Sequence, residues 1–263
     1  MIYEKNIIPN VNFHEEDSID LLNQIFGKEN VFTFDNPHEV KRLYKFDLEG
    51  HSLILRTSIN SAKIIYRSLF NIPWNGHRYF DCDVWVPKLK QWYLNQDYNF
   101  LDLEEIQRRF YSYYIKPLFI RPNSGDKTFA GQVFYPKTLE NEILYLKSLN
   151  YDPKDIFCLY ASQSDHIKSE YRCVIVNNKC ISSSRYMKDG KLDTLGRVPK
   201  NVYDFVEQII HSNDFLQYEV MDYCLDVGIV DGDCYLIEIN STETSSFYGA
   251  NLKKIYEAIK NRE

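Results

Sequence analysis

The sequence lacks any apolar run approaching the roughly 20 residues that a membrane-spanning helix needs. Its first ten residues, MIYEKNIIPN, also lack the basic, apolar and small-residue regions of a signal peptide. No internal repeat and no low-complexity stretch is present. We therefore expect a globular, cytoplasmic protein with no membrane as a partner.

The six cysteines lack the C-x-x-C spacing that zinc sites and redox motifs use. Most of them lie inside apolar runs, so we expect buried thiols rather than a zinc site or a disulfide framework. The cysteines are Cys82, Cys158, Cys173, Cys180, Cys224 and Cys234.

An excess of positive charge is absent as well. Lys and Arg total 31 against 37 for Asp and Glu, which gives a formal net charge of -6, and the basic residues are scattered. Because nucleic-acid-binding surfaces are usually basic, we expect no nucleic acid as a partner. What is present is a hydrophobic content of 44% in 263 residues, enough for one large domain or two modest ones.

The spacing of apolar residues predicts a mixture of helices and strands. Helix spacing occurs over residues 18–26, 59–70, 102–113, 138–148 and 202–211. Strand-like runs occur at residues 31–34 and 52–55 and alternate with helices after residue 116. The run PWNGHRYFDCDVWVP, residues 73–87, predicts a loop-rich connection. This order indicates an α+β or α/β arrangement built largely from antiparallel strands.

Residues 223–240, YCLDVGIVDGDCYLIEIN, predict a β-hairpin with an acidic residue in each strand. A two-residue loop would place Asp226 and Glu238 on opposite faces, whereas a three-residue loop over 230–232 places them on one face. We expect the three-residue loop, with Gly232 in the left-handed conformation, because it gathers the apolar side chains on the other face. Asp226, Glu238 and Asn240 then form an all-oxygen set suited to Mg²⁺.

A solvated outer face with incidental acids explains this hairpin equally well. If the metal face exists, we expect Asp231 and Asp233 to be solvated bystanders at the turn. We also expect Asp226→Asn and Glu238→Gln to leave the fold intact, since each change relieves carboxylate repulsion.

Four basic residues lie at strand edges in the same half of the chain. In the hairpin over 170–186, a turn at Asn177-Asn178 or at Asn178-Lys179 predicts Arg172 and Arg185 on one face. Arg121 and Lys127 flank a Pro-Asn-Ser-Gly loop.

The string GDKT at residues 125–128 is not a P-loop, because the glycines of that motif are missing. Each of the four cations alone is explained by a surface position or a salt bridge. Together with the acidic face, they predict a polyphosphate ligand with Mg²⁺.

The order of these segments resembles the ATP-grasp superfamily: a strand-borne cation after a helix, an E-x-R strand, then Asp on one strand and E-x-N on the next. The chain looks most like a branch common in phages, whose members carry F-x-R-P, a following Lys, E-Y-R and E-I-N. The resemblance covers residues 114–263. It implies an α+β ATP-grasp fold in which two α+β subdomains clamp ATP, preceded by a smaller α/β N-terminal domain.

The boundaries implied by the resemblance are 1–110 for the N-terminal domain and 111–263 for the ATP-grasp domain. Within the latter, the first subdomain would cover 111–160 and the second 161–263.

The resemblance also implies roles for individual residues. Asp226, Glu238 and Asn240 would hold Mg²⁺, and Arg172 and Arg185 would be catalytic cations that reach the γ-phosphate and the acyl phosphate. The implied nucleotide-binding residues are Arg121, Lys127, Leu159, Tyr160, Ala161, Ser162 and Glu170. Lys127 and Glu238 would then face one another across a single cleft. Two departures are a phosphate loop reduced to Asn123-Ser124-Gly125 and an adenine-hinge acid that is not legible.

The implied activity is a carboxylate-amine ligase that uses ATP and Mg²⁺, with small-molecule or peptide carboxylates and amines as substrates. The polar segment 241–249, STETSSFYG, is either an acceptor-binding loop or an ordinary surface loop. The alternatives are a nucleotide-binding pseudoenzyme and a phosphotransferase with the same ATP clamp. An intact set of Asp226, Glu238 and Asn240 argues against the pseudoenzyme.

Overall fold

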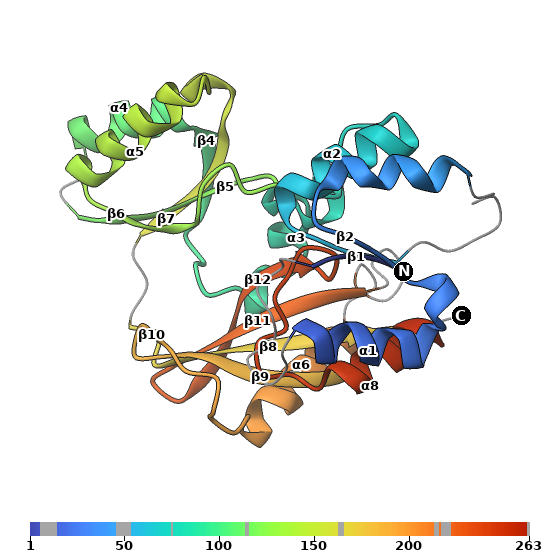
Figure 1. The fold of residues 1–263 in the computed structure, drawn as a ribbon. Coiled ribbons are helices and arrows are strands. Elements are labelled where there is room, and N and C mark those ends of the chain that lie inside the picture. Colours follow the sequence, from blue (N-terminus) through green and yellow to red (C-terminus); the bar gives the residue numbers. More distant parts are fainter. Residues whose placement is uncertain are drawn as a thin grey trace. The chain divides into compact units, whose positions relative to one another are not determined.

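A computed structural model of the chain describes residues 1–5, 15–45, 54–74, 76–113, 116–162, 166–212, 216 and 222–261. The chain forms two compact units (Figure 1). Unit 1 consists of Met1–Asn75 together with Ile167–Glu263, and unit 2 consists of Gly76–His166. Each unit contains its own sheets and its own buried core. The domain boundaries implied by the resemblance stay a prediction.

Unit 2 is built on a four-stranded antiparallel sheet with the strand order β4-β7-β5-β6. The strands are β4 (Asn99–Asp102), β5 (Leu118–Pro122), β6 (Gln132–Phe134) and β7 (Phe157–Ser162). The helices are α3 (Cys82–Lys88), α4 (Leu103–Tyr113) and α5 (Pro136–Ser148). The helices expected over 102–113 and 138–148 are therefore present.

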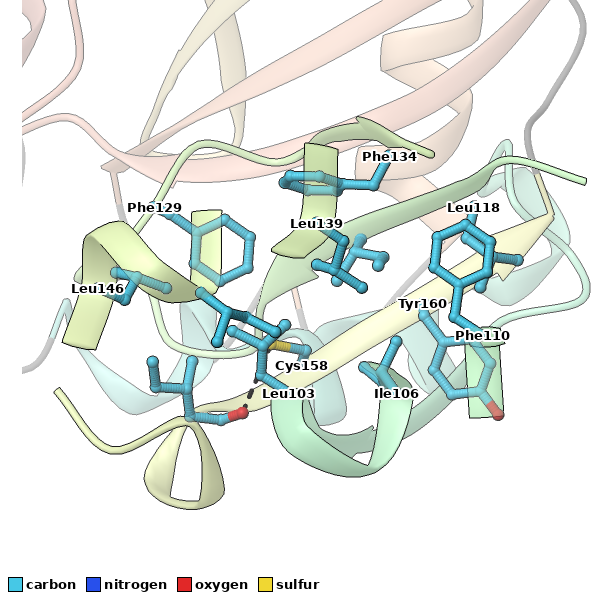
Figure 2. Packing of buried hydrophobic residues seen from close by; sticks show 13 residues of the cluster. Leu103, Ile106, Phe110, Leu118, Phe129, Phe134, Leu139, Leu146, Cys158 and Tyr160 are labelled. Carbon is cyan, nitrogen blue, oxygen red and sulfur yellow. Dashed lines mark hydrogen bonds between the residues drawn. The ribbon is translucent and has the colours of Figure 1, made fainter. Parts of the chain in front are cut away.

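The core of unit 2 lies between its sheet and the helices α4 and α5 (Figure 2). Helix-spaced side chains such as Leu103 and Ile106 of α4 meet Leu139 of α5 and alternate side chains of the sheet. Ile120 and Tyr160 are paired neighbours on this covered face. Since side chains alternate along a strand, the residues next to them in sequence lie on the other face of the sheet.

The run over 73–87 is more regular than expected. Residues Arg78–Phe80 form a single 3-10 turn and Cys82–Lys88 form α3, with Pro87 inside the helix. Trp85 and Val86 are fully buried. Packing of these apolar side chains outweighs the turn-forming composition of the run, so the expectation of a loop-rich connection is wrong there.

The N-terminal part of unit 1 is a small parallel sheet with the strand order β2-β1-β3. The strands are β1 (Ile2–Glu4), β2 (Phe32–Phe34) and β3 (Leu55–Arg56), and the helices are α1 (Glu15–Phe26) and α2 (Ile59–Phe70). Helix α2 spans the residues expected from the sequence, and its cap is Ser58, whose side chain accepts a hydrogen bond from the Ser61 amide. Of the strand expected over 52–55, residues 52 and 53 lie outside the described residues.

The larger sheet of unit 1 is antiparallel, with the strand order β10-β9-β8-β11-β12. Its strands are β8 (Ser169–Val176), β9 (Lys179–Lys188), β10 (Lys191–Leu192), β11 (Asp222–Val230) and β12 (Asp233–Ser241). The helices that follow are α6 (Lys200–Ser212) and α8 (Leu252–Lys260). Helices α1 and α8 lie side by side against one face of this sheet, over Val174, Val176 and Cys224 (Figure 1).

The β11-β12 hairpin brings its acids together by a different route from the expected one. Val230 pairs with Asp233, so the loop consists of Asp231 and Gly232 only, and the expected three-residue loop is wrong. A β-bulge after Asp226 then shifts the register by one residue and places Asp226 directly opposite Glu238. The expected shared face is present because the bulge compensates for the shorter loop.

Bulges have the opposite effect on the β8-β9 hairpin. Its turn is Asn177-Asn178, but two register shifts follow, so that Ser184 pairs with Arg172 and Arg185 pairs with Tyr171. Arg172 and Arg185 therefore lie on opposite faces of the sheet. The expectation that they share a face is wrong, because it assumed an uninterrupted ladder.

We expect Gly232→Val to destabilise the protein by about 1 to 3 kcal/mol, because a β-branched residue is strained at positive φ. The φ of Gly232 is 97° and no atom lies within 4 Å of an added Cβ, so backbone strain alone is tested. The matched control is Asp231→Asn, which keeps a side chain suited to the φ of 51° at this position. Urea unfolding measures both variants, and equal midpoints would contradict the two-residue loop.

Candidate functional site

The centre of the candidate site is a buried ion pair between β8 and β11. The Arg172 guanidinium donates from Nε to Asp226 Oδ1 at 2.8 Å and from Nη2 to Asp226 Oδ2 at 2.7 Å. The two side chains are 8% and 2% exposed, respectively. The remaining terminal nitrogen, Nη1, donates to the carbonyl of Ser246 at 2.9 Å. This two-bond geometry fixes the plane of the guanidinium as well as its distance.

Three of the residues expected to hold a metal lie on this same face. Asn240 Nδ2 donates to Asp226 Oδ2 at 3.3 Å, and Glu238 is the cross-strand partner of Asp226. Glu238 is half-buried, whereas Asp226 and Asn240 are buried. Asp231 and Asp233 are exposed at the turn, as expected for bystanders.

Two tyrosines that the sequence did not single out complete this face. Tyr186 Oη donates to Glu170 Oε2 at 2.5 Å. The Tyr186 ring stacks on Tyr248, with centroids 4.8 Å apart and planes 12° from parallel. The Arg172 guanidinium carbon lies 5.1 Å from the Tyr248 centroid and 5.6 Å from that of Tyr186. The E-Y-R string predicts the place of Glu170, but no sequence signal predicts the register shift next to Tyr186.

Negative charge is concentrated here. Burial raises the pKa of Glu170; the Tyr186 hydroxyl opposes this rise, and the charges of Asp226 and Glu238 add to it. The donors are all oxygens, which fits Mg²⁺, an ion usually held by one or two carboxylates together with phosphate oxygens. In the part of the chain that the structure describes, no three His, Cys, Asp or Glu side chains converge as a preformed metal site. The residues thus fit a cation that arrives with a nucleotide.

The polar segment 241–249 is anchored to the N-terminal part of unit 1. Arg56 Nη2 donates to the Ser245 carbonyl at 2.8 Å and Nη1 donates to the Thr242 carbonyl. The Glu243 side chain accepts hydrogen bonds from Tyr66 Oη at 2.9 Å and from Trp74 Nε1 at 3.3 Å. The interpretation as an ordinary surface loop is therefore wrong, and the anchoring residues were missed because they lie far away in sequence.

Arg185 lies elsewhere in unit 1. Its Nη2 donates to Asp193 Oδ2 at 2.6 Å, and its guanidinium packs so closely on Gly196 that a side chain there would clash. Together with Lys188, Lys191 and neighbouring residues it lines a hollow of about 770 Å³. The structure does not bring Arg185 together with Arg172.

In unit 2, part of the expected nucleotide set shares the sheet face opposite α4 and α5. Arg121 pairs with Leu159, and Ala161 lies on the same face two residues further along β7. Arg121 is buried. Tyr160 belongs instead to the core under the helices, and the Ser162 amide at the strand end donates to Asp97 Oδ2 at 3.1 Å.

The loop that carries Lys127 is tied to α3 by two acids that the sequence analysis missed. The Gly125 amide donates to Asp81 Oδ1 at 3.1 Å, and Asn123 Nδ2 donates to Asp83 Oδ1 at 2.9 Å. Arg78 in turn bonds to both acids, each at 2.7 Å. The F-D-C-D string was the available signal. Because Lys127 and Glu238 belong to different units, their expected approach stays a prediction.

Comparison with known proteins identifies the class. A protein-family model for an ATP-grasp domain matches residues 93–258, more than half of the chain, and the fold class expected from the sequence is confirmed. The chain belongs to the ATP-grasp superfamily. Within it, the matching model describes the second family of one clade of ATP-grasp domains. No curated protein matches the chain.

Solved structures of similar fold include ligases. The RimK domain protein ATP-grasp from Sphaerobacter thermophilus is 10% identical with a TM-score of 0.56, covering 98% of each chain. A RiPP-associated ATP-grasp ligase from Chryseobacterium gregarium, solved with ADP and a leader and core peptide, is 13% identical with a TM-score of 0.51, covering 100% of this chain and 97% of that one. The D-alanine--D-alanine ligase from Bacillus anthracis is 16% identical with a TM-score of 0.50, covering 99% and 92%. At these identities the likeness shows the fold alone. Among the described helices, none is long and apolar enough to cross a membrane.

We expect Asp226→Asn to destabilise the protein by about 3 to 5 kcal/mol, because it leaves the buried Arg172 without its counter-charge. The earlier expectation of an unaffected fold assumed an unpaired carboxylate, and the hydrogen bonds to Arg172 contradict that assumption. Glu238→Gln is the matched control and should change the free energy of unfolding by less than about 1 kcal/mol. Urea unfolding of both variants checks this, and equal losses would contradict a special role for the pair.

Glu170→Gln should gain stability relative to the unmodified protein as the pH rises. The pKa of Glu170 is raised in the folded state, so its contribution to stability is fully present below the unfolded-state pKa and is lost as the pH rises through the folded-state pKa. Gln cannot ionise and still accepts the Tyr186 hydrogen bond. Unfolding free energies of both proteins between about pH 4 and pH 7 test this, and a difference that stays constant with pH would refute it.

Proposed function

We propose that this protein is an ATP-dependent carboxylate-amine ligase that acts through an acyl phosphate with Mg-ATP. The observation that carries the proposal is the bonded set of Arg172, Asp226 and Asn240 with Glu238 directly opposite Asp226. A protein that only kept the fold would have no need to maintain this costly buried charge pair. Membership of the ATP-grasp superfamily supports the same conclusion.

The reaction joins two substrates in two steps. The γ-phosphoryl group of ATP passes to a substrate carboxylate, giving ADP and an acyl phosphate. The nitrogen of an amine then attacks the acyl carbon, the C–N bond forms, the C–O bond to phosphate breaks, and the amine loses a proton. Mg²⁺ supplies charge neutralisation on the phosphate oxygens when bound. Positioning and electrostatic stabilisation are the contributions of the protein itself.

The residues divide into those that bind and those that orient. Glu238 and Asn240 are the proposed protein ligands of Mg²⁺. Asp226 holds Arg172 through both carboxylate oxygens, so its role is to orient this guanidinium beside the site at least as much as to bind metal. Arg185 is not part of the proposed site, since it lies on the other face of the sheet.

Unit 2 is proposed to contribute to nucleotide binding. Arg121 and Lys127 supply positive charge for phosphates, and the backbone of Leu159–Ser162 supplies hydrogen-bonding groups for the base. The open face that Arg121, Leu159 and Ala161 share supports this assignment.

The proposed substrates are small-molecule or peptide carboxylates and amines, used in the cytoplasm. The names of the fold neighbours cover both kinds, a D-alanine ligase and a ligase with a bound leader and core peptide. Mass spectrometry of cell extract incubated with the protein, Mg²⁺ and labelled ATP would reveal the product as an ATP-dependent condensation mass shift.

Mg-ATP is expected to raise the melting temperature. A ligand present at roughly 100 times its Kd stabilises the folded state by about 2.7 kcal/mol. Glu238→Gln should abolish Mg²⁺-dependent ADP release while its exposed neighbour, varied as Asp231→Asn, should leave it unchanged. An unchanged melting curve in millimolar Mg-ATP would refute nucleotide binding, and ADP release that never depends on an added amine would favour a phosphotransferase over a ligase.

A further inference from the structure

The segment 242–247, directly after β12, is held through its backbone carbonyls. Those of Thr242 and Ser245 accept from Arg56, that of Glu243 from the Thr57 amide at 2.9 Å, that of Ser246 from Arg172, and that of Phe247 from Ser184 Oγ at 3.2 Å. The donors come from or directly follow three different strands, β3, β8 and β9. A segment bound at so many points has one backbone conformation.

Arg56 is an unusual donor in this set. It is 5% exposed, and in the described part of the chain it forms no ion pair with a carboxylate and its Nε has no hydrogen-bond partner. Its guanidinium carbon lies 4.0 Å from the centroid of Phe247. A buried cation without a counter-charge is costly, and an apolar residue would serve stability better. The planar guanidinium, however, can bridge two carbonyls three residues apart and stack on a ring at the same time.

The position that Arg56 sets reaches the site over very short distances. Ser246, the next residue after Ser245, accepts the hydrogen bond from Arg172. At the other end, Thr242 follows the expected metal ligand Asn240 after a single residue. Tyr248, which stacks on Tyr186, has a φ of 49°, and its amide donates to Ser246 Oγ at 3.3 Å. Both ends of the segment thus adjoin residues of the candidate site.

We infer that Arg56 is a positioning residue for the ligase site: by fixing segment 242–247 it holds Arg172 and Asn240 in the geometry that binding of the metal-nucleotide complex requires. The inference rests on the proposed function. Arg56 touches backbone carbonyls and a ring rather than any substrate, so it acts through the segment. A residue in the small parallel sheet would therefore control a site on the large antiparallel sheet.

The test compares Arg56→Met, Arg56→Lys and the control Lys5→Met in the full chain. Lys5 follows the same small sheet and pairs with Asp35 at 2.7 Å on the surface, away from the segment. The first measurement is hydrogen exchange of the peptide covering residues 241–250. The second is the Mg²⁺ concentration that gives half of the melting-temperature rise in the presence of the nonhydrolysable analogue AMPPNP.

Arg56→Met should speed exchange of the peptide by roughly tenfold or more. It should also raise the half-saturating Mg²⁺ concentration by roughly tenfold, the usual effect of losing a residue that orients metal ligands. Arg56→Lys should give intermediate values for both, since an ammonium can donate to the carbonyls but cannot stack as a plane on Phe247. Lys5→Met should behave like the unmodified protein.

A residue that only stabilised the fold would lower the melting temperature without moving the Mg²⁺ midpoint, and that outcome overturns the inference. If Arg56→Met fails to fold, an Arg56→Lys protein with unchanged exchange and an unchanged midpoint overturns it equally. An unmodified protein that shows no Mg²⁺-dependent response to AMPPNP contradicts the proposed function instead. A normal response there, retained in Arg56→Met, contradicts this inference alone.

Discussion

The buried pair of Arg172 and Asp226 is the interaction on which the rest of the site depends. Taking two charges out of water is tolerated only when geometry and further hydrogen bonds satisfy them, and here Asn240 and the Ser246 carbonyl complete the set. The pair therefore dictates the register of β8 against β11 and the path of the chain after β12. Stacked Tyr186 and Tyr248 then close one side of the guanidinium.

Sequence patterns predicted the helices well and the strand registers poorly. Helix α2 begins and ends where apolar spacing indicates, because the period of a helix is set locally. Each large hairpin contains register shifts that no local signal announces. In β11-β12 the shift restored the expected face for Asp226 and Glu238, whereas in β8-β9 it separated Arg172 from Arg185. A bulge is decided by what both faces of a sheet must pack, which is tertiary information.

The candidate site shows the same limit. Asp226, Glu238 and Asn240 could be predicted as one set, since strand alternation and residue chemistry point to them together. The partners that hold them could not. Arg56, Tyr66 and Trp74 act on residues far along the chain, and Asp81 and Asp83 grip a loop some forty positions away, with |i−j| of 44 from Asp81 to Gly125. Composition reveals chemistry, but second partners depend on which distant segments the fold brings together.

The anchoring of the segment after β12 by Arg56 has a consequence for biosynthesis. The two partners are separated by 186 positions, so the contact cannot form until nearly the whole chain has left the ribosome. Unit 2 is continuous in sequence and lies between the two parts of unit 1, so it can fold while the last strands are still being made. The small N-terminal sheet must wait for its partner. A truncated or stalled chain would then contain a folded unit 2 but no ordered metal face, which protects the cell from an ATP-consuming fragment.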